Sequence, residues 1–181
     1  MTRSTVAGVL FLLTFLLGLT GIILFIAREN TGWFDAPFAL QRSLILASWL
    51  VAAAGAVFLA GVHPRVQPSA LLVMGVVLFA LGGLIAAVAE LSLLTRAFTI
   101  TSTWGVVFAS SLFVGEALIG VGLLRSGPVP PWVARTVIGW NMLWLVTLLL
   151  ISREDMYYPG LHYIPLLLIG IPLVRRHQRP S

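Results

Sequence analysis

Glu116 is the residue best placed to carry chemistry inside an apolar part of the sequence. It lies near the middle of the apolar stretch 102–124, where an ionisable side chain is costly and is a functional hypothesis by default. Asn141 stands at a similar depth in the stretch 132–151, and its amide could hydrogen-bond the Glu116 carboxyl. No Arg lies at that depth, so a neutral, protonated Glu116 that faces the protein interior is expected. Two roles stay open: an interhelical bond that fixes packing, or a site for proton transfer or ligand binding.

Tryptophans at neighbouring depths could line a ligand pocket. Trp140 and Trp144 are four residues apart and share one helix face. Trp49 lies in the outer half of the second apolar stretch, and Trp104 stands at the start of the fourth. Together they could enclose an apolar or amphipathic molecule. Packing against other helices, or contact with lipid, is the alternative use of the same rings.

The acidic residues near the end of the fifth stretch allow a weak metal hypothesis. Glu154, Asp155 and His162 could meet if the short fifth connection folds back, with His162 at the outer surface. Carboxylates with a single His have no diagnostic spacing here, so neither a metal site nor a cofactor is predicted. Surface ion pairs are the expected use of these acids. The basic residues available on the same side are Arg28, Arg42, Arg96 and Arg153.

Missing residue types and motifs exclude several classes of protein. There is no Cys, which removes disulfides, thiol catalysis and iron–sulfur clusters. All 11 basic residues are Arg, and the missing Lys removes a Schiff base and a phosphate loop of the Gly-Lys-Ser/Thr type. No Ser-His-Asp set and no HExxH motif appears. The sequence therefore favours a protein that is not an enzyme.

The elements that must position these residues are apolar helices. Of 181 residues, 59% are hydrophobic and only 9% are charged, whereas soluble domains carry about a quarter charged residues. A membrane-spanning helix needs about 20 mostly apolar residues. Six stretches qualify: Val6–Ala27, Ser43–Val62, Ser69–Leu91, Ser102–Leu124, Trp132–Ile151 and Tyr158–Val174. The predicted fold is all-α, a single transmembrane domain over residues 1–181 in which six helices with short loops form a bundle.

The Arg residues predict the orientation of the bundle. With six spans, seven Arg and no acid fall on the side of the two termini, and four Arg with five acids fall on the other. Because cytoplasmic loops carry the excess of basic residues, both termini are expected in the cytoplasm. The composition, rich in Arg, Ala, Leu, Val and Gly, favours a bacterial source and hence the cytoplasmic (inner) membrane. Arg175, Arg176 and Arg179 are expected to contact anionic headgroups of the inner leaflet, and no soluble domain for nucleic acid is present.

The second stretch carries a pattern that predicts close helix packing. Ser48, Ala52, Ala56 and Ala60 recur every four residues and form one stripe of small side chains. Lipid gives no hydrophobic drive for helix association, so such a stripe favours close approach of another backbone. The neighbour is expected to be another helix of the same chain, with a second copy of the chain as the alternative.

The sixth stretch contains two prolines, Pro165 and Pro172. Each lacks an N–H and would free the carbonyl group four residues earlier. Two interpretations are open. One is a short, kinked helix on the flank of the bundle, and the other is a broken helix that lines a binding cavity, as in transporters.

Two runs of sequence carry a family resemblance. Arg3–Thr14 and Gly115–Gly127, the latter followed by Pro130-Pro131-Trp132, resemble uncharacterised small bacterial membrane proteins with six predicted spans, which are grouped as a domain of unknown function. The resemblance implies the six-span architecture over most of the chain and no activity. No functional residue follows from it.

Three functions are compatible with these sequence features. The first is a non-enzymatic membrane protein that binds partner proteins or lipids within the membrane, as an accessory subunit of a larger complex or as a homo-oligomer. The second is a small transporter or ligand-binding protein with a site at Glu116 and Asn141, beside the tryptophans. The third is an intramembrane enzyme that modifies a lipid, with Glu116 or the outer acids as general base. The absence of catalytic motifs favours the first.

Overall fold

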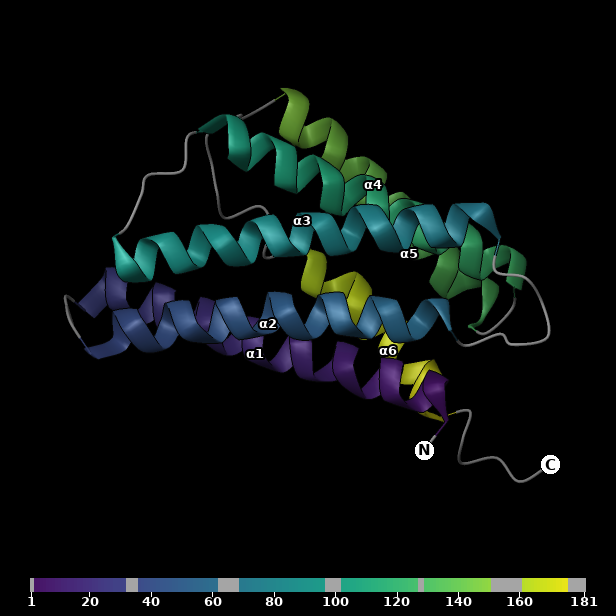
Figure 1. Ribbon diagram of the computed structural model, residues 1–181, viewed down its shortest axis with the longest axis horizontal. Helices are drawn as coiled ribbons and strands as arrows, with labels where there is room; N and C mark the ends of the chain where they lie inside the picture. Colours follow the sequence, from purple (N-terminus) through teal and green to yellow (C-terminus); the bar gives the residue numbers. More distant parts are fainter. Residues whose placement is uncertain are drawn as a thin grey trace.

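Six helices make up the described part of the chain, which contains no strand. The computed structural model describes residues 2–31, 36–61, 69–96, 102–126, 129–150 and 161–175. The helices are α1 (Arg3–Thr31), α2 (Ala36–Ala60), α3 (Ala70–Thr95), α4 (Ser102–Ser126), α5 (Pro131–Leu150) and α6 (Tyr163–Arg175) (Figure 1). The all-α fold predicted from the sequence is therefore confirmed.

Four of the helices are long and apolar enough to cross a membrane. By length and composition these segments are Arg3–Ala27, Phe38–Ala60, Ala70–Thr95 and Trp104–Arg125. Their outer faces expose large apolar side chains such as Leu16, which a soluble protein rarely gathers on its surface. The structure is that of a membrane-embedded protein, in which α5 has 20 residues and α6 is a shorter apolar helix of 13.

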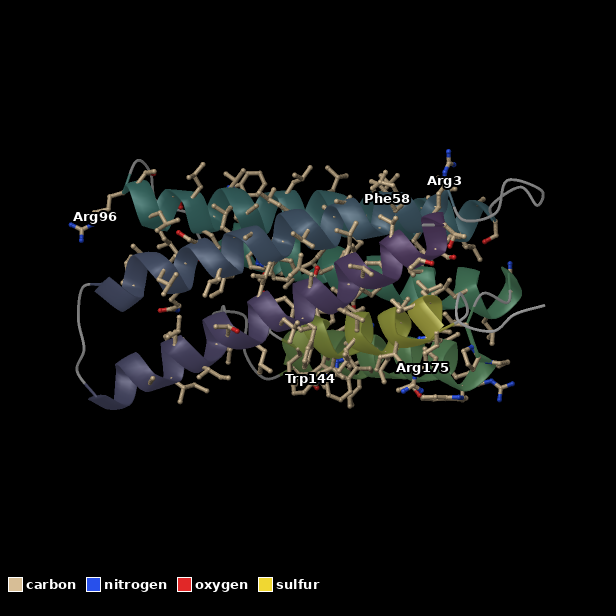
Figure 2. The ribbon with its side chains drawn as sticks, turned by 90° about the horizontal axis from the view of Figure 1, so that it is seen from below. Arg3, Phe58, Arg96, Trp144 and Arg175 are labelled. Carbon is tan, nitrogen blue, oxygen red and sulfur yellow. The ribbon has the colours of Figure 1, made fainter. Side chains whose placement is uncertain are left out.

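The helices pack in chain order, and α6 closes the bundle. Each of the first five helices packs on the next one along the chain. α6 packs mainly on α1 and also on α5, so that the last helix bridges the first and the fifth (Figure 2). The interior is therefore enclosed only when α6 is in place.

Glycines allow α3 and α4 to approach closely. A Cβ atom at Gly75 would lie 2.8 Å from the carbonyl oxygen of Gly115, and one at Gly115 would lie 2.6 Å from the backbone nitrogen of Phe79. α1 and α6 meet in the same way, because a Cβ at Gly8 would lie 2.9 Å from the carbonyl oxygen of Gly170. Close backbone contact of this kind is the usual basis of helix association in membranes.

The stripe of small residues on α2 faces the interior, as predicted. Ser48, Ala52 and Ala56 are fully buried, and Ala60 is half-buried. A Cβ at the neighbouring Gly55 would lie 2.9 Å from the ring of Phe11, so α1 is one helix that approaches this part of α2. The expectation that the stripe packs within one chain is confirmed.

α6 is shorter than the sequence predicted. A span was expected over Tyr158–Val174, but the α-helix begins at Tyr163, after a 3₁₀ turn at residues 161–162. At about 1.5 Å per residue its length is about 20 Å, below the roughly 30 Å of the bilayer core. Pro165 lies in the first turn, where a missing N–H leaves no helical bond unmade, and Pro172 lies inside the helix.

Candidate functional site

A polar pair lies at the centre of the bundle, between α4 and the start of α6. Glu116 is near the middle of α4 and its side chain is fully buried, which confirms that it faces the interior. His162 is also fully buried, and its Nδ1 lies 3.4 Å from Oε2 of Glu116. A carboxyl and an imidazole that hold one proton between them are neutral overall, whichever of the two carries it. The pair can therefore be buried without a third charge.

Asn141 of α5 completes the cluster. Its side chain is fully buried and lies near the carboxyl of Glu116, but the hydrogen bond between them that the sequence analysis considered does not form. Its Nδ2 donates to the carbonyl oxygen of Val137, one turn earlier in α5, at 2.8 Å. The three polar side chains thus come from α4, from α5 and from the turn before α6.

Several polar atoms of the cluster lack a hydrogen-bond partner among the described residues. They are both carboxyl oxygens of Glu116, both ring nitrogens of His162 and Oδ1 of Asn141, because the 3.4 Å approach of the pair does not meet hydrogen-bond geometry. Unpaired buried polar atoms are costly and are commonly satisfied by internal water. Their convergence from three elements marks a place for a small polar occupant.

The turn that carries His162 is held on both sides. Trp140 of α5 donates from Nε1 to the carbonyl oxygen of Leu161 at 3.1 Å, and the hydroxyl of Tyr163 lies 2.8 Å from the hydroxyl of Ser48 on α2. Trp140 and Ser48 stand in the middle of their helices. The start of α6 therefore lies at mid-height of the bundle.

Aromatic rings enclose the imidazole. The ring of Phe113 lies 4.1 Å from that of His162, centre to centre, and the ring of Trp49 meets it edge to face at 6.1 Å. Trp49 also packs on Tyr163 at 5.5 Å. Among the described residues, the surroundings of the pair are thus apolar except for Asn141 and the backbone, so any unbalanced charge there is strongly disfavoured.

The position of His162 corrects the sequence analysis. The prediction that it lies at the outer surface is wrong, because that prediction began the sixth helix at Tyr158, and the helix begins later and deeper in the bundle. The metal hypothesis required His162 beside Glu154 and Asp155, and these two acids lie outside the described residues. Within the described ranges no group of three His, Cys, Asp or Glu side chains could hold a metal ion.

The four tryptophans that were predicted to line a ligand pocket do not share one environment. Trp140 and Trp144 pair edge to face at 6.0 Å, and Trp49 is buried against His162. Trp104 is 52% exposed on the outer face of α4. The rings of Trp49 and Trp140 therefore flank the turn before α6, and none of the four lines the apolar pocket between α1, α2 and the start of α6.

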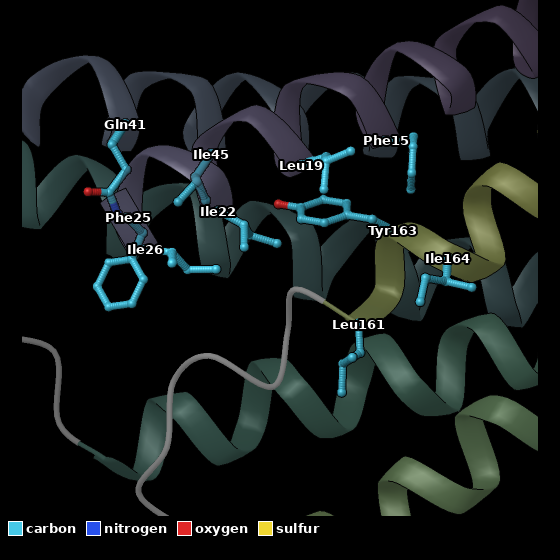
Figure 3. A pocket seen from close by; sticks show the side chains of 10 residues that line it. All are labelled: Phe15, Leu19, Ile22, Phe25, Ile26, Gln41, Ile45, Leu161, Tyr163 and Ile164. Atoms are coloured by element: carbon cyan, nitrogen blue, oxygen red, sulfur yellow. The ribbon is translucent and has the colours of Figure 1, made fainter. Parts of the chain in front are cut away.

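An apolar pocket of about 390 Å³ lies beside this turn, between α1, α2 and the start of α6. Leu19, Ile26 and Ile164 in its wall are exposed, so the pocket opens on the side of the bundle. Figure 3 shows the lining residues. They are Phe15, Leu19, Ile22, Phe25, Ile26, Gln41, Ile45, Leu161, Tyr163 and Ile164.

Gln41 is the amide in this pocket wall. Its side chain is buried, and neither Oε1 nor Nε2 has a hydrogen-bond partner among the described residues. Figure 3 shows it at one end of the pocket, toward which the hydroxyl of Tyr163 also points. The pocket therefore offers one donor and one acceptor at one end and apolar surface elsewhere.

An ion pair joins α2 to α3 next to Gln41. Nη1 of Arg42 donates to both carboxylate oxygens of Glu90, at 3.2 and 3.1 Å. The sequence analysis expected Arg42 to pair with an acid at the surface. The pair is instead mostly buried, with 14% of the Arg42 side chain and 11% of the Glu90 side chain exposed.

Sequence reasoning missed Gln41 and the contact between His162 and Glu116. The available signal for Gln41 was its place four residues before Ile45, on one face of an apolar helix. No protein-family model, curated protein or solved structure matches the chain. The resemblance to small six-span bacterial membrane proteins therefore stays a prediction.

Proposed function

We propose that the chain is a non-enzymatic, six-span protein of the bacterial cytoplasmic membrane that binds a lipid-like molecule within the membrane. The observation that carries the proposal is the pocket between α1, α2 and α6, which is apolar except for the end where Gln41 lies. Its volume lies at the small end of the roughly 300–1,000 Å³ found for ligand sites. A pocket that opens sideways from a membrane helix bundle is entered from lipid rather than from water.

The chemistry of the wall defines the class of ligand. The apolar walls suit a single hydrocarbon or isoprenoid chain, since each buried CH₂ group contributes about 0.8 kcal/mol. The free donor and acceptor of Gln41 suit a neutral hydroxyl or carbonyl group at one end of that chain. A charged headgroup would meet no opposite charge among the residues that line the pocket.

We infer the orientation with both termini in the cytoplasm from the Arg residues. Figure 2 supports it, because Arg3 and Arg175 lie toward one end of the bundle and Arg96 lies at the other. Arg175 is exposed at the end of α6, where it can meet anionic headgroups of the inner leaflet. Arg176 and Arg179, which were expected to do the same, lie outside the described residues.

Reporter fusions test this orientation. Fusions at Arg65 and Arg125 should report the cytoplasm, and fusions at Asp35 and Asp155 should report the outer side, because basic residues favour the inner side. Opposite results at any two of these sites would show that the proposed topology is wrong.

A pair of matched variants tests the ligand proposal. Ile22→Trp puts a large ring into the pocket, whereas Ile23→Trp puts the same ring on the outer face, where Ile23 is 55% exposed. The protein is purified with native lipids, and the molecules bound to it are identified by native mass spectrometry. Wild type and Ile23→Trp should retain the same neutral apolar molecule, and Ile22→Trp should lose it. Equal retention by both variants would refute the pocket as the binding site.

A third variant tests the role of the amide. Gln41→Leu removes the donor and the acceptor but keeps the apolar wall. It should weaken binding of a neutral fatty alcohol by about 2- to 10-fold, the worth of one net hydrogen bond. An unchanged Kd would show that Gln41 does not contact the ligand's polar group.

A further inference from the structure

The turn before α6 faces two sites at once. Leu161 and Tyr163 line the apolar pocket, while His162 between them contacts Glu116 in the buried cluster. Consecutive residues of one turn thus form part of the pocket wall and supply the imidazole of the buried cluster. An occupant of the pocket that shifts the backbone of this turn therefore also displaces His162.

The polar cluster has the chemistry of a proton site. A carboxyl and an imidazole are the side chains that most often exchange protons in proteins. Glu116, His162 and Asn141 converge with polar atoms that have no partner among the described residues, which is a suitable place for internal water. Water next to an acid and a base gives the proton a route between them and out of the pair.

The same surroundings disfavour a metal ion. His162 directly precedes α6, and the N-terminal end of a helix carries partial positive charge. A divalent cation beside one carboxylate would leave net positive charge in an apolar interior, next to that helix end. A proton shared by Glu116 and His162 leaves no net charge.

We propose that Glu116, His162 and Asn141 form a hydrated intramembrane proton site whose protonation is coupled to occupancy of the apolar pocket. The coupling rests on the proposed function, whereas the proton site does not. The pair is neutral with one proton and charged when it gains a second proton or loses the first. A pocket occupant that shifts the turn displaces His162 relative to Glu116 and so changes how strongly the pair holds its proton. Ligand affinity therefore differs between the protonation states of the pair.

Other titratable groups near the cluster must be separated from it. On α6 this is Tyr163, which is hydrogen-bonded to Ser48. On α2 and α3 they are Arg42 and Glu90, which pair with each other. Among the described residues, α5 presents Asn141 and Trp140 to this region and no charged group. Glu90 is therefore the carboxyl that a control experiment has to exclude.

The experiment measures the affinity of a pocket ligand as a function of pH. The full-length protein in nanodiscs is titrated with a pyrene-labelled fatty alcohol, a probe that does not itself titrate. For the wild type, Kd should change by about fivefold or more between about pH 5 and pH 8. The double variant Glu116→Gln/His162→Asn, which leaves no titratable group in the cluster, should still bind the probe, with a Kd that no longer depends on pH. Glu90→Gln should keep the dependence of the wild type.

Three outcomes would overturn the inference. A wild-type Kd that is constant with pH refutes the coupling, and so does the same dependence in the double variant Glu116→Gln/His162→Asn. A metal ion retained at one equivalent per chain refutes the proton site. If neither the wild type nor Ile23→Trp binds the probe, the proposed ligand function fails, and the coupling fails with it.

The proton site has a readout that does not depend on the ligand. Protein labelled with ¹⁵N-histidine gives imidazole signals whose positions report protonation, and His162→Asn identifies the signal of His162. Glu116→Gln should change the pH dependence of that signal, because this variant lacks the carboxyl with which His162 shares a proton. An unchanged titration would refute the proton site even if the ligand binds.

Discussion

Replacing Gly115 by Ala should destabilise the bundle, whereas the same change at Gly105 should not. Both glycines lie on α4, but their surroundings differ. A Cβ at Gly115 would lie 2.6 Å from the nitrogen and 2.9 Å from the Cα of Phe79, whereas one at Gly105 meets nothing within 4 Å. The obstacle at Gly115 is backbone, so it cannot be relieved by a change of rotamer. α3 and α4 must move apart instead.

The size of the effect follows from the contacts. Forcing an extra methyl group into a close-packed contact costs about 1–3 kcal/mol. Ala stabilises a helix relative to Gly by about 0.5–1 kcal/mol, and this gain is the same in both variants. In Gly115→Ala the cost of the clash outweighs it. At about 2–4 °C per kcal/mol for a chain of this size, the clash should separate the two melting temperatures by roughly 2–12 °C. The difference between the variants removes the propensity term, because both make the same substitution in the same helix.

Thermal unfolding in one detergent, followed by intrinsic Trp fluorescence, is the assay. Gly105→Ala should melt at or slightly above the wild type, and Gly115→Ala clearly below it. Equal melting temperatures for the two variants would refute the close approach of α3 and α4 at Gly115. So would a lower melting temperature for Gly105→Ala alone.

Two further predictions concern the packing of α2. Ala56→Leu should lower the melting temperature because Ala56 is fully buried, whereas Ala54→Leu on the exposed face should leave it unchanged; equal effects would show that the stripe does not pack. Arg42→Gln and Glu90→Gln should each lower the free energy of unfolding by more than half as much as the double variant does. The reason is that each single change leaves one mostly buried charge unpaired. A double-mutant cycle with no coupling energy would show that the ion pair does not stabilise the fold.

Much of the architecture could be predicted from the sequence because hydropathy is local. Apolar stretches of about 20 residues identify the helices, and the cost of burying a carboxyl was enough to place Glu116 in the interior. The stripe that begins at Ser48 could be predicted for a similar reason, since spacing by four is a property of one helix. Each of these conclusions depends on a single segment.

The contact between His162 and Glu116 could not be predicted in this way. It depends on where α6 begins and at what height it packs, and contacts with another helix influence both. Gly8 and Gly170 allow α1 and α6 to touch, and a Cβ at Gly18 would meet the ring of Tyr163. These are long-range contacts, and nothing in the run around His162 distinguishes a surface turn from an interior one. The pocket escaped prediction for the same reason, since its walls come from three separate parts of the chain.

The bridging position of α6 also has a consequence for biosynthesis. α6 is the last of the six described helices to leave the ribosome, and it contacts both the first and the fifth. Until it arrives, α1 has no partner along its Gly8 face, and Glu116 has no imidazole beside it. A helix of 13 residues is too short to cross the bilayer core by itself, so the position of α6 depends on its contacts with α1 and α5. An incomplete chain would therefore lack the imidazole beside its intramembrane carboxyl, which distinguishes it physically from the finished protein.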